Sequence, residues 1–456
     1  MYKIPDNKIL LLFFAPAVFL FIILLLLGQN FIFSFYIVAV YCIFATALVS
    51  NKTGLFLLLF FRPCLDYFLN DAVSVFNFEI NMAGLFSVLA IFFTLFVIIK
   101  NSTQTGKFPL VPAWLFFMAV ALASLFFSVD AGASLVQLSR YLSTVLIFYA
   151  SFILIKNNSD LANLIKTIVA SAIIPALVAI YQYFTGTGLT YPYEGIYNRV
   201  FGTFAQPNIL AFYLVLAIAL CLAIFLSGDK KKISILLYGL LAGLYLVTLA
   251  FTYTRSAWLG LLLVVIMLGI ARYRKFLIIA LIFLTICFFS IQQINTRLQS
   301  LTVMSASSSV QFRLNLWSDG IGYFLQRPVI GYGVGTSNEV VLDKRGPSFG
   351  SPDAHNDYLR VAIDTGTIGL ISFLLLTISL ISTLLANYRR QSKPRLKTLS
   401  FVILMIAVCF SLISFGDNVL VNTALEWALW AVFGGILAIQ KFSPTAKTIR
   451  RSQTAV

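Results

Sequence analysis

Charged residues are scarce in this sequence. Only 11% of the 456 residues are charged, against roughly a quarter in a soluble domain, whereas 60% are hydrophobic. A water-soluble globular fold is excluded, because no soluble core of this size needs so much apolar surface. Windows of about 20 mostly apolar residues, the length that crosses a bilayer, recur along almost the whole chain. The composition predicts an all-α integral membrane protein, with residues 1–456 forming a single polytopic domain.

Cysteine and histidine are also rare. The five cysteines are scattered, and no C-x-x-C spacing occurs, so neither a disulfide framework nor a thiolate metal site is indicated. The single histidine, His355, stands between Asp353 and Asp357. A carboxylate–histidine metal site is one alternative there, but metal sites usually recruit more ligands than these. We expect no metal and no cofactor.

A nucleotide-binding fingerprint is likewise missing. Residues 331–335 read Gly-Tyr-Gly-Val-Gly, which lacks the strand, the helix and the glycine spacing of a dinucleotide site. The run is better explained by tight backbone turns.

Hydrophobic runs predict about 14 membrane-spanning helices, and twelve would fit the loop charges equally well. The expected spans cover residues 10–27, 31–49, 54–69, 80–99, 111–127, 135–155, 164–184, 209–226, 233–251, 257–270, 276–291, 358–385, 399–415 and 419–439. The third is the weakest, because Arg62, Pro63 and Asp66 interrupt it.

The net charge of +16 has two explanations, nucleic-acid binding or the excess of basic residues in cytoplasmic loops. The basic residues form short clusters between apolar runs, which favours the second and argues against a nucleic-acid partner. With a cytoplasmic N-terminus, the inside segments hold 22 of the 32 basic residues and only three acidic ones. Both termini are then cytoplasmic, and residues 292–354 form one large outside loop that can cap a site.

Three polar segments fall on the outside in this topology: residues 198–208, 252–260 and 353–360. His355 lies at the mouth of an expected helix, where the positive end of the helix dipole favours the neutral imidazole that a general base needs. A lone histidine is more often an ordinary surface or core residue, and that alternative remains open here.

Two arginines in these segments have two interpretations. Arg255 and Arg199 either extend their side chains to the membrane surface or clamp an anion, because a guanidinium group matches phosphate oxygens. Two acidic residues, Asp364 and Glu426, fall inside expected spans and are functional candidates for that reason. They could equally form ion pairs with Arg255, Arg140 or Arg360.

Four pieces in order resemble the O-antigen ligase and polymerase superfamily of bacterial membrane glycosyltransferases. The pieces are Arg199 with Gly202-Thr203-Phe204 and Pro207-Asn208; Thr254-Arg255-Ser256; the loop run from Arg327 to Gly335; and His355-Asn356-Asp357-Tyr358-Leu359 with the later Gly366-Thr367-Ile368-Gly369-Leu370. The motif region covers residues 197–370.

The resemblance implies a multi-pass protein of the bacterial inner membrane with a periplasmic site capped by the large loop. It implies transfer of a glycan from undecaprenyl diphosphate to an acceptor hydroxyl on a glycan or lipid such as lipid A–core. Arg199 and Arg255 would hold the diphosphate, and His355 would assist the acceptor. Asn208, Asp357 and Arg360 are expected as supporting residues.

Several activities share these motifs: ligation, polymerisation of the glycan, and transfer to protein. A flippase for the same lipid-linked glycan is the competing class, but it should line a path through the membrane with charges. Most spans here carry no charged residue, which argues against a flippase. We expect a transferase that needs no metal, with ligation slightly favoured over polymerisation.

Overall fold

The structure is a computed structural model that describes most of the chain between residues 50 and 441. The described parts are residues 50–67, 72–75, 78–101, 108–189, 198–227, 232–271, 309–345, 353–420 and 422–441, with scattered residues at 16–46, 274 and 278. The expected spans at 10–27, 31–49 and 276–291 lie wholly or partly outside this set.

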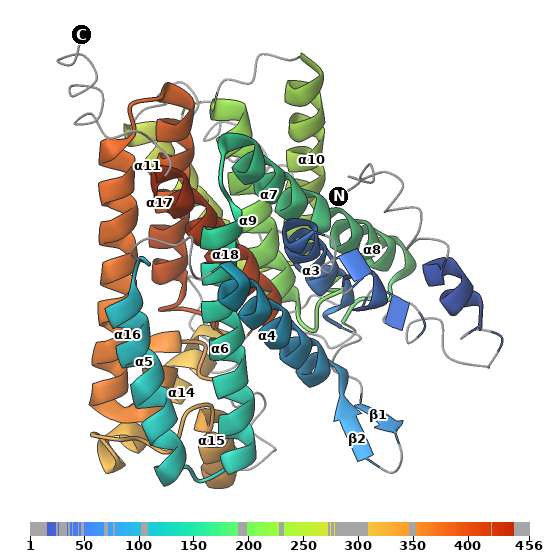
Figure 1. Cartoon of the computed structure of the whole chain (residues 1–456). Helices are drawn as coiled ribbons and strands as arrows, with labels where there is room; N and C mark the ends of the chain where they lie inside the picture. The colour runs from blue at the N-terminus through green and yellow to red at the C-terminus, as the bar shows by residue number, and fades with distance from the viewer. Residues whose placement is uncertain are drawn as a thin grey trace.

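Helices dominate the described chain (Figure 1). They are α3 (Asn51–Leu65), α4 (Met82–Asn101), α5 (Val111–Ser124), α6 (Ala131–Leu154), α7 (Asn158–Ser171), α8 (Ile173–Thr185), α9 (Pro207–Leu226), α10 (Lys232–Phe251), α11 (Arg255–Ala271), α14 (Ser309–Gln326), α15 (Ser337–Arg345), α16 (Asp357–Arg390), α17 (Pro394–Ile413) and α18 (Thr423–Lys441). A short antiparallel hairpin, β1 (Ala72–Val75) and β2 (Phe78–Asn81), precedes α4.

The helices confirm the expected all-α membrane class. Within the described residues, six helical stretches are long and apolar enough to cross a bilayer: 131–154, 158–185 (α7 and α8 together), 207–226, 232–251, 357–390 and 394–413. Four shorter apolar helices accompany them, at 86–101, 111–127, 255–270 and 423–439. The count of 14 spans stays a prediction.

Several expected spans have different boundaries in the structure, for local reasons. The span at 164–184 is two helices, α7 and α8, which meet at Ala172. Pro175 stands in the first turn of α8, and proline has no N–H to continue the ladder of α7. The last span begins at Thr423 instead of Val419, because residues 414–420 form a polar turn.

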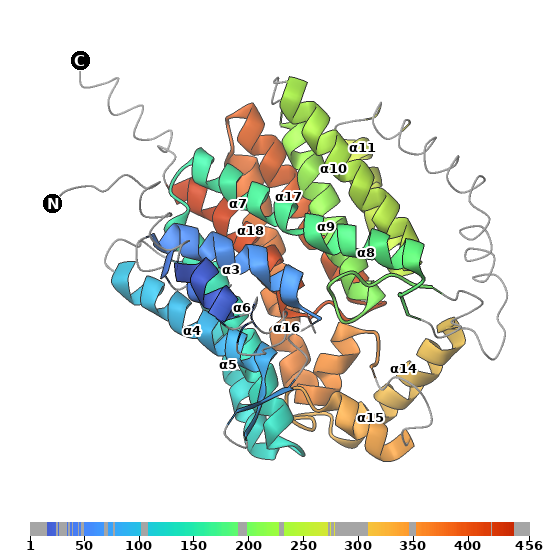
Figure 2. The ribbon, with the colours of Figure 1, turned by 90° about the vertical axis from the view of Figure 1, so that its right-hand side faces the viewer.

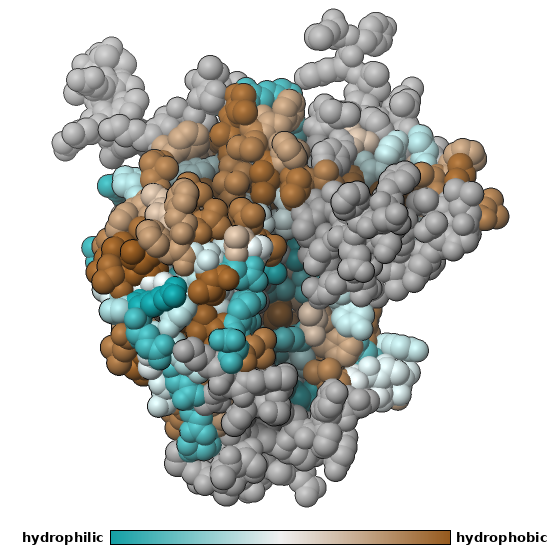
Figure 3. All heavy atoms as spheres, turned by 90° about the horizontal axis from the view of Figure 1, so that it is seen from below, coloured by the Kyte–Doolittle hydropathy of each residue, from teal (hydrophilic) through white to brown (hydrophobic). Residues whose placement is uncertain are grey.

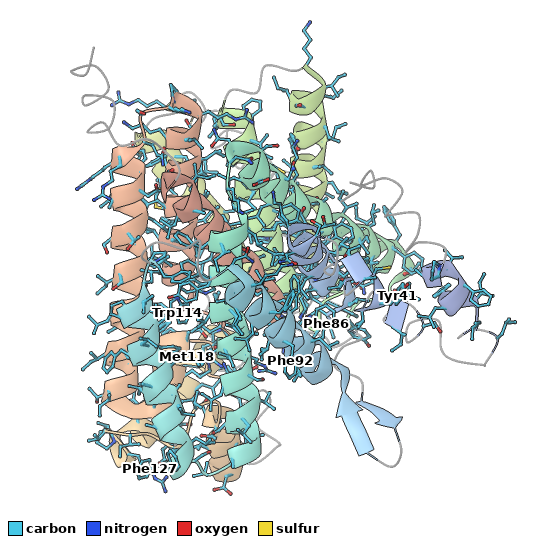
Figure 4. The ribbon with its side chains drawn as sticks, viewed as in Figure 1. Tyr41, Phe86, Phe92, Trp114, Met118 and Phe127 are labelled. Carbon is cyan, nitrogen blue, oxygen red and sulfur yellow. The ribbon has the colours of Figure 1, made fainter. Side chains whose placement is uncertain are left out.

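Buried aromatic residues hold the middle of the bundle. In the 18-residue apolar stretch of α9 and of α17, 72% of the residues are buried, against 17% in the corresponding stretch of α10. Helix α10 therefore lies at the periphery. Trp427 of α18 is fully buried, stacks on Phe86 of α4 and donates its indole N–H to Ser143. Phe86 and Trp114 are buried in the same core, whereas Phe92 is 65% exposed (Figure 4).

Figures 1 and 2 both show α14 and α15 at the lower end of the bundle. A glycine-rich loop joins α14 to α15 and packs against α16. Gly331, Gly333 and Gly335 all have positive φ angles, which confirms the tight turns expected from this run.

The glycine-rich loop packs against a kink in α16. Gly366 has φ 66° and ψ −166° inside the helix, and a side chain there would collide with the backbone of Val329. The kink leaves the carbonyl oxygens of Ile363 and Asp364 open to the loop, where Tyr332 and Gly333 donate their N–H groups to them at 3.0 and 2.8 Å. Because only glycine adopts this conformation without strain, Gly366 decides where the loop docks.

Candidate active site where three helices begin

Three helices begin at the same place. They are α9 at Pro207, α11 at Arg255 and α16 at Asp357, and the turn at residues 414–420 between α17 and α18 lies among them. Asn356 caps α16 by accepting the N–H of Leu359 at 3.0 Å. Helix N-termini carry partial positive charge and unpaired N–H groups, so their convergence favours an anionic ligand.

Asp417 lies at the centre of this arrangement. Its Oδ1 is 3.2 Å from Nδ1 of His355. Its Oδ2 accepts hydrogen bonds from Ser256 at 3.0 Å, Asn208 at 3.2 Å and Arg313 at 3.3 Å. One carboxylate, only 2% exposed, therefore joins all three polar segments that the sequence singles out.

The surroundings of Asp417 favour its ionised form. Burial raises the pKa of this carboxyl, but the hydrogen bond to His355 and the positive charge of Arg313 outweigh the burial, and the pKa lies below its usual value. Asp417 is thus a fixed negative charge beside the imidazole.

His355 is well placed to accept a proton. It precedes the α16 cap and adopts a left-handed backbone conformation with φ 49°, which is strained for a residue other than glycine. In the tautomer that donates Nδ1–H to Asp417, Nε2 carries the lone pair. Nε2 has no hydrogen-bond partner within the described residues, and the side chain remains 17% exposed.

Arg199 is held in a defined orientation. It donates from Nε to the carbonyl of Thr252 at 3.0 Å, and from Nη2 to Asn208 at 3.0 Å and Thr254 at 3.2 Å. Asn208 in turn donates to Asp417, so it connects the arginine with the Asp417–His355 pair. Arg255 is the first residue of α11 and is half-buried at the same end of the bundle.

Asp357 holds the central turn in place. Its carboxylate accepts the N–H groups of Val419 at 2.7 Å and Leu420 at 3.1 Å, and its own N–H donates to Ser414 at 2.9 Å. Arg360, one turn further along α16, lies 3.4 Å from the same carboxylate. Both residues therefore support the turn that carries Asp417.

The two aspartates that flank His355 in sequence bond elsewhere. Asp357 bonds the turn, and Asp353 accepts from Asn338 of α15 at 2.9 Å. The carboxylate that orients the imidazole comes instead from Asp417, 62 residues away. Among the described residues, no group of three or more histidine, cysteine or acidic side chains is arranged to hold a metal ion.

Comparison with known proteins points to one family. Residues 240–374 match the model of the O-antigen ligase family. A Rickettsia conorii protein, named as a candidate polysaccharide ligase, is 24% identical over 265 residues. The aligned region covers 54% of this chain and 60% of that relative. The expected resemblance to the O-antigen ligases is confirmed.

The O-antigen ligase match contains only part of the site. Arg255, Arg313 and His355 lie within the matched residues, whereas Arg199, Asn208 and Asp417 lie outside them. The fold brings the two groups together.

Sequence reasoning missed Asp417 and Arg313. Arg313 of α14 donates to the carbonyl of Gly416 at 2.6 Å and to Asp417, so α14 closes over the central turn. A signal for Asp417 exists, because Gly416-Asp417-Asn418 interrupts two apolar runs. Nothing local distinguishes Arg313 from the other polar residues of its segment.

The buried acid Asp364 has a structural role other than the ion pairs considered from the sequence. Its carboxylate accepts the N–H groups of Gly335 and Ser337, both at 2.8 Å. It therefore ties the glycine-rich loop and the start of α15 to α16. Figure 3 shows the molecule from below, from the end where α14 and α15 lie. On this face hydrophilic residues gather in the middle, around a hollow.

Proposed function

We propose that this protein is an O-antigen ligase-like glycosyltransferase that moves a glycan from undecaprenyl diphosphate to an acceptor hydroxyl. The observation that carries the proposal is the Asp417–His355 pair, which lies with Arg199 and Arg255 where three helices begin. The pair supplies a general base, and the cations supply a site for a diphosphate leaving group.

The reaction follows from these positions. Nε2 of His355 takes the proton of the acceptor hydroxyl, and the oxygen attacks the anomeric carbon of the donor. The bond between that carbon and the diphosphate oxygen breaks, and the electron pair leaves with the diphosphate. Arg199, Arg255 and the helix N-termini stabilise the charge that develops there. A single displacement inverts the anomeric centre. Asp417 stabilises the imidazolium that forms.

Lipid A–core or another surface glycan is the acceptor class in this proposal. The name of the Rickettsia conorii relative supports ligation over polymerisation. Purified protein in lipid nanodiscs would be given an undecaprenyl-diphosphate-linked glycan, with or without lipid A–core. We expect product only when the acceptor is present. Elongated glycan from the donor alone would identify a polymerase, and no transfer in either reaction would contradict the proposal.

We place the site on the periplasmic side of the bacterial inner membrane, with residues 292–354 as the loop that caps it and both termini in the cytoplasm. The distribution of basic residues supports this orientation. Reporter fusions at Lys231, Arg390 and the C-terminus should report cytoplasm, and a fusion at Ser308 should report the periplasm. A cytoplasmic signal at Ser308 would overturn the orientation.

Transfer should require no divalent cation, because arginines and helix N-termini neutralise the leaving group. Activity in EDTA should equal activity in buffer. Loss in EDTA that magnesium or manganese restores would show that Asp353 or Asp417 helps to hold a metal.

A further inference from the structure

A second polar cluster lies deeper in the bundle, between α3, α6, α16 and α18. It contains three arginines, Arg62, Arg140 and Arg360, and the buried acid Glu426. Arg62 is held mainly as a structural residue, although its Nε has no hydrogen-bond partner within the described chain. Its Nη1 pairs with Asp66 at 2.6 Å, its Nη2 donates to Thr423 at 2.6 Å, and its guanidinium lies over the Trp427 ring.

The other two arginines have too few acceptors. Arg140 makes one hydrogen bond, from Nη1 to Gln137 at 3.3 Å, and no ion pair within the described chain. Arg360 is only 5% exposed, yet its Nε and Nη2 have no hydrogen-bond partner there. The Nε2 of Gln137, 2% exposed, also lacks one. Three buried N–H donor groups of Arg360 and Gln137 therefore lack an acceptor within the described chain. Leaving buried donors unpaired costs free energy of folding, so a bound acceptor would stabilise them.

The nearby carboxylates do not supply that acceptor. Asp357 accepts from Val419 and Leu420, Asp364 accepts from Gly335 and Ser337, and Glu426 accepts from Thr144 at 3.0 Å. Asp357 forms an ion pair with Nη2 of Arg360 at 3.4 Å, but the two groups are not aligned for a hydrogen bond. Arg140 and Arg360 carry like charges in the same cluster, and among the described residues Glu426 interacts with both.

We propose that Arg140, Arg360 and Gln137 form a phosphate-binding site for the acceptor, separate from the donor diphosphate site at Arg199 and Arg255. This inference rests on the proposed transferase function. A phosphate group has enough oxygens for two guanidinium groups and an amide, whereas one guanidinium fork already satisfies a carboxylate. An anion between the two arginines also relieves their repulsion.

The position suits an acceptor. Arg360 follows Asp357 by three residues, about 5 Å along the helix axis, so it lies roughly one sugar unit inward from the start of α16 beside His355. Arg140 is half-buried, whereas Arg360 is buried, so Arg140 is the more accessible of the two arginines. The site would hold a phosphorylated sugar while its free hydroxyl reaches Nε2 of His355.

Direct binding tests this site independently of transfer. Protein in nanodiscs would be titrated with a phosphorylated core glycolipid, with the same glycolipid after dephosphorylation, and with inorganic phosphate. The wild type should bind the phosphorylated glycolipid about 10–100-fold more tightly than the dephosphorylated one. Arg140→Gln should remove this difference, Arg140→Lys should keep part of it, and all three proteins should bind the undecaprenyl diphosphate donor equally.

Arg389→Gln is the matched control, because it removes one positive charge from the far end of α16, where the side chain is exposed. It should bind both glycolipids as the wild type does. Binding of inorganic phosphate alone would assign the site to a free ion and overturn the acceptor role. Equal affinity of the wild type for the two glycolipids, or weaker donor binding by Arg140→Gln, would also overturn it. If glycolipid discrimination persists without any transfer, the proposed function fails and the site stands.

Discussion

Asp417 and Asp364 are almost equally buried, at 2% and 1% exposure, but they bind different kinds of partner. Asp417 is surrounded mainly by side chains: His355, Ser256, Asn208 and Arg313. Asp364 accepts backbone N–H groups from the glycine-rich loop. A carboxylate bound to side chains can tune their charge and orientation, whereas one bound to the backbone fixes the path of the chain. The first arrangement suits catalysis, and the second holds the framework.

The largest expected effect is at His355 and Arg255. His355→Ala should lower the transfer rate by about 10²–10⁴-fold, because it removes the proposed base. Arg255→Ala should cost about 10²–10³-fold, since it removes a positioned positive charge. Arg255→Lys should recover part of the activity, because an ammonium keeps the charge but loses the planar fork. Both alanine variants should accumulate in the membrane and melt in detergent as the wild type does.

Near-normal transfer by His355→Ala would show that another group takes the proton. Unchanged activity and donor affinity in Arg255→Ala would place the diphosphate on Arg199 or on Arg140 and Arg360.

Asp417→Asn should show the same kind of loss. The amide keeps the shape but removes the charge that orients and stabilises the imidazole, so transfer should fall by up to about 10⁴-fold. Donor affinity should change little, because Arg199 keeps its bonds to Thr252 and Thr254. Kinetics and donor binding measured on the same preparation would check this. A variant as active as the wild type would reduce Asp417 to a structural residue.

Asp364→Asn should behave in the opposite way. It weakens two buried hydrogen bonds to the backbone, which should cost about 1–3 kcal/mol of stability. Its melting temperature should fall, and the folded fraction should retain the wild-type rate per molecule. A catalytic loss at unchanged melting temperature would put Asp364 in the reaction and remove the contrast with Asp417.

The smallest effect concerns pH. Because the folded pKa of Asp417 lies below its unfolded value of about 3.9, its contribution to stability is complete above that pH. The contribution is lost as the pH falls through the folded pKa. Melting temperature should therefore decline more steeply below about pH 4 in the wild type than in Asp417→Asn. Parallel curves for the two proteins would show that this carboxyl is not stabilised on folding.

The helical membrane class can be read from the apolar runs alone, because runs of this length have no other stable solution in a bilayer. The sequence also determined which segments carry the polar chemistry, since His355, Arg199 and Arg255 stand out against apolar neighbours. Tertiary structure alone decided their partners. The Asp417–His355 pair spans 62 residues and the Asn208–Asp417 bond spans 209, and no local period encodes such a pairing. Asp353 and Asp357 are closer to His355 in sequence, but neither orients it. Asp353 accepts a hydrogen bond from the amide of Asn338, and Asp357 accepts one from the backbone N–H of Val419.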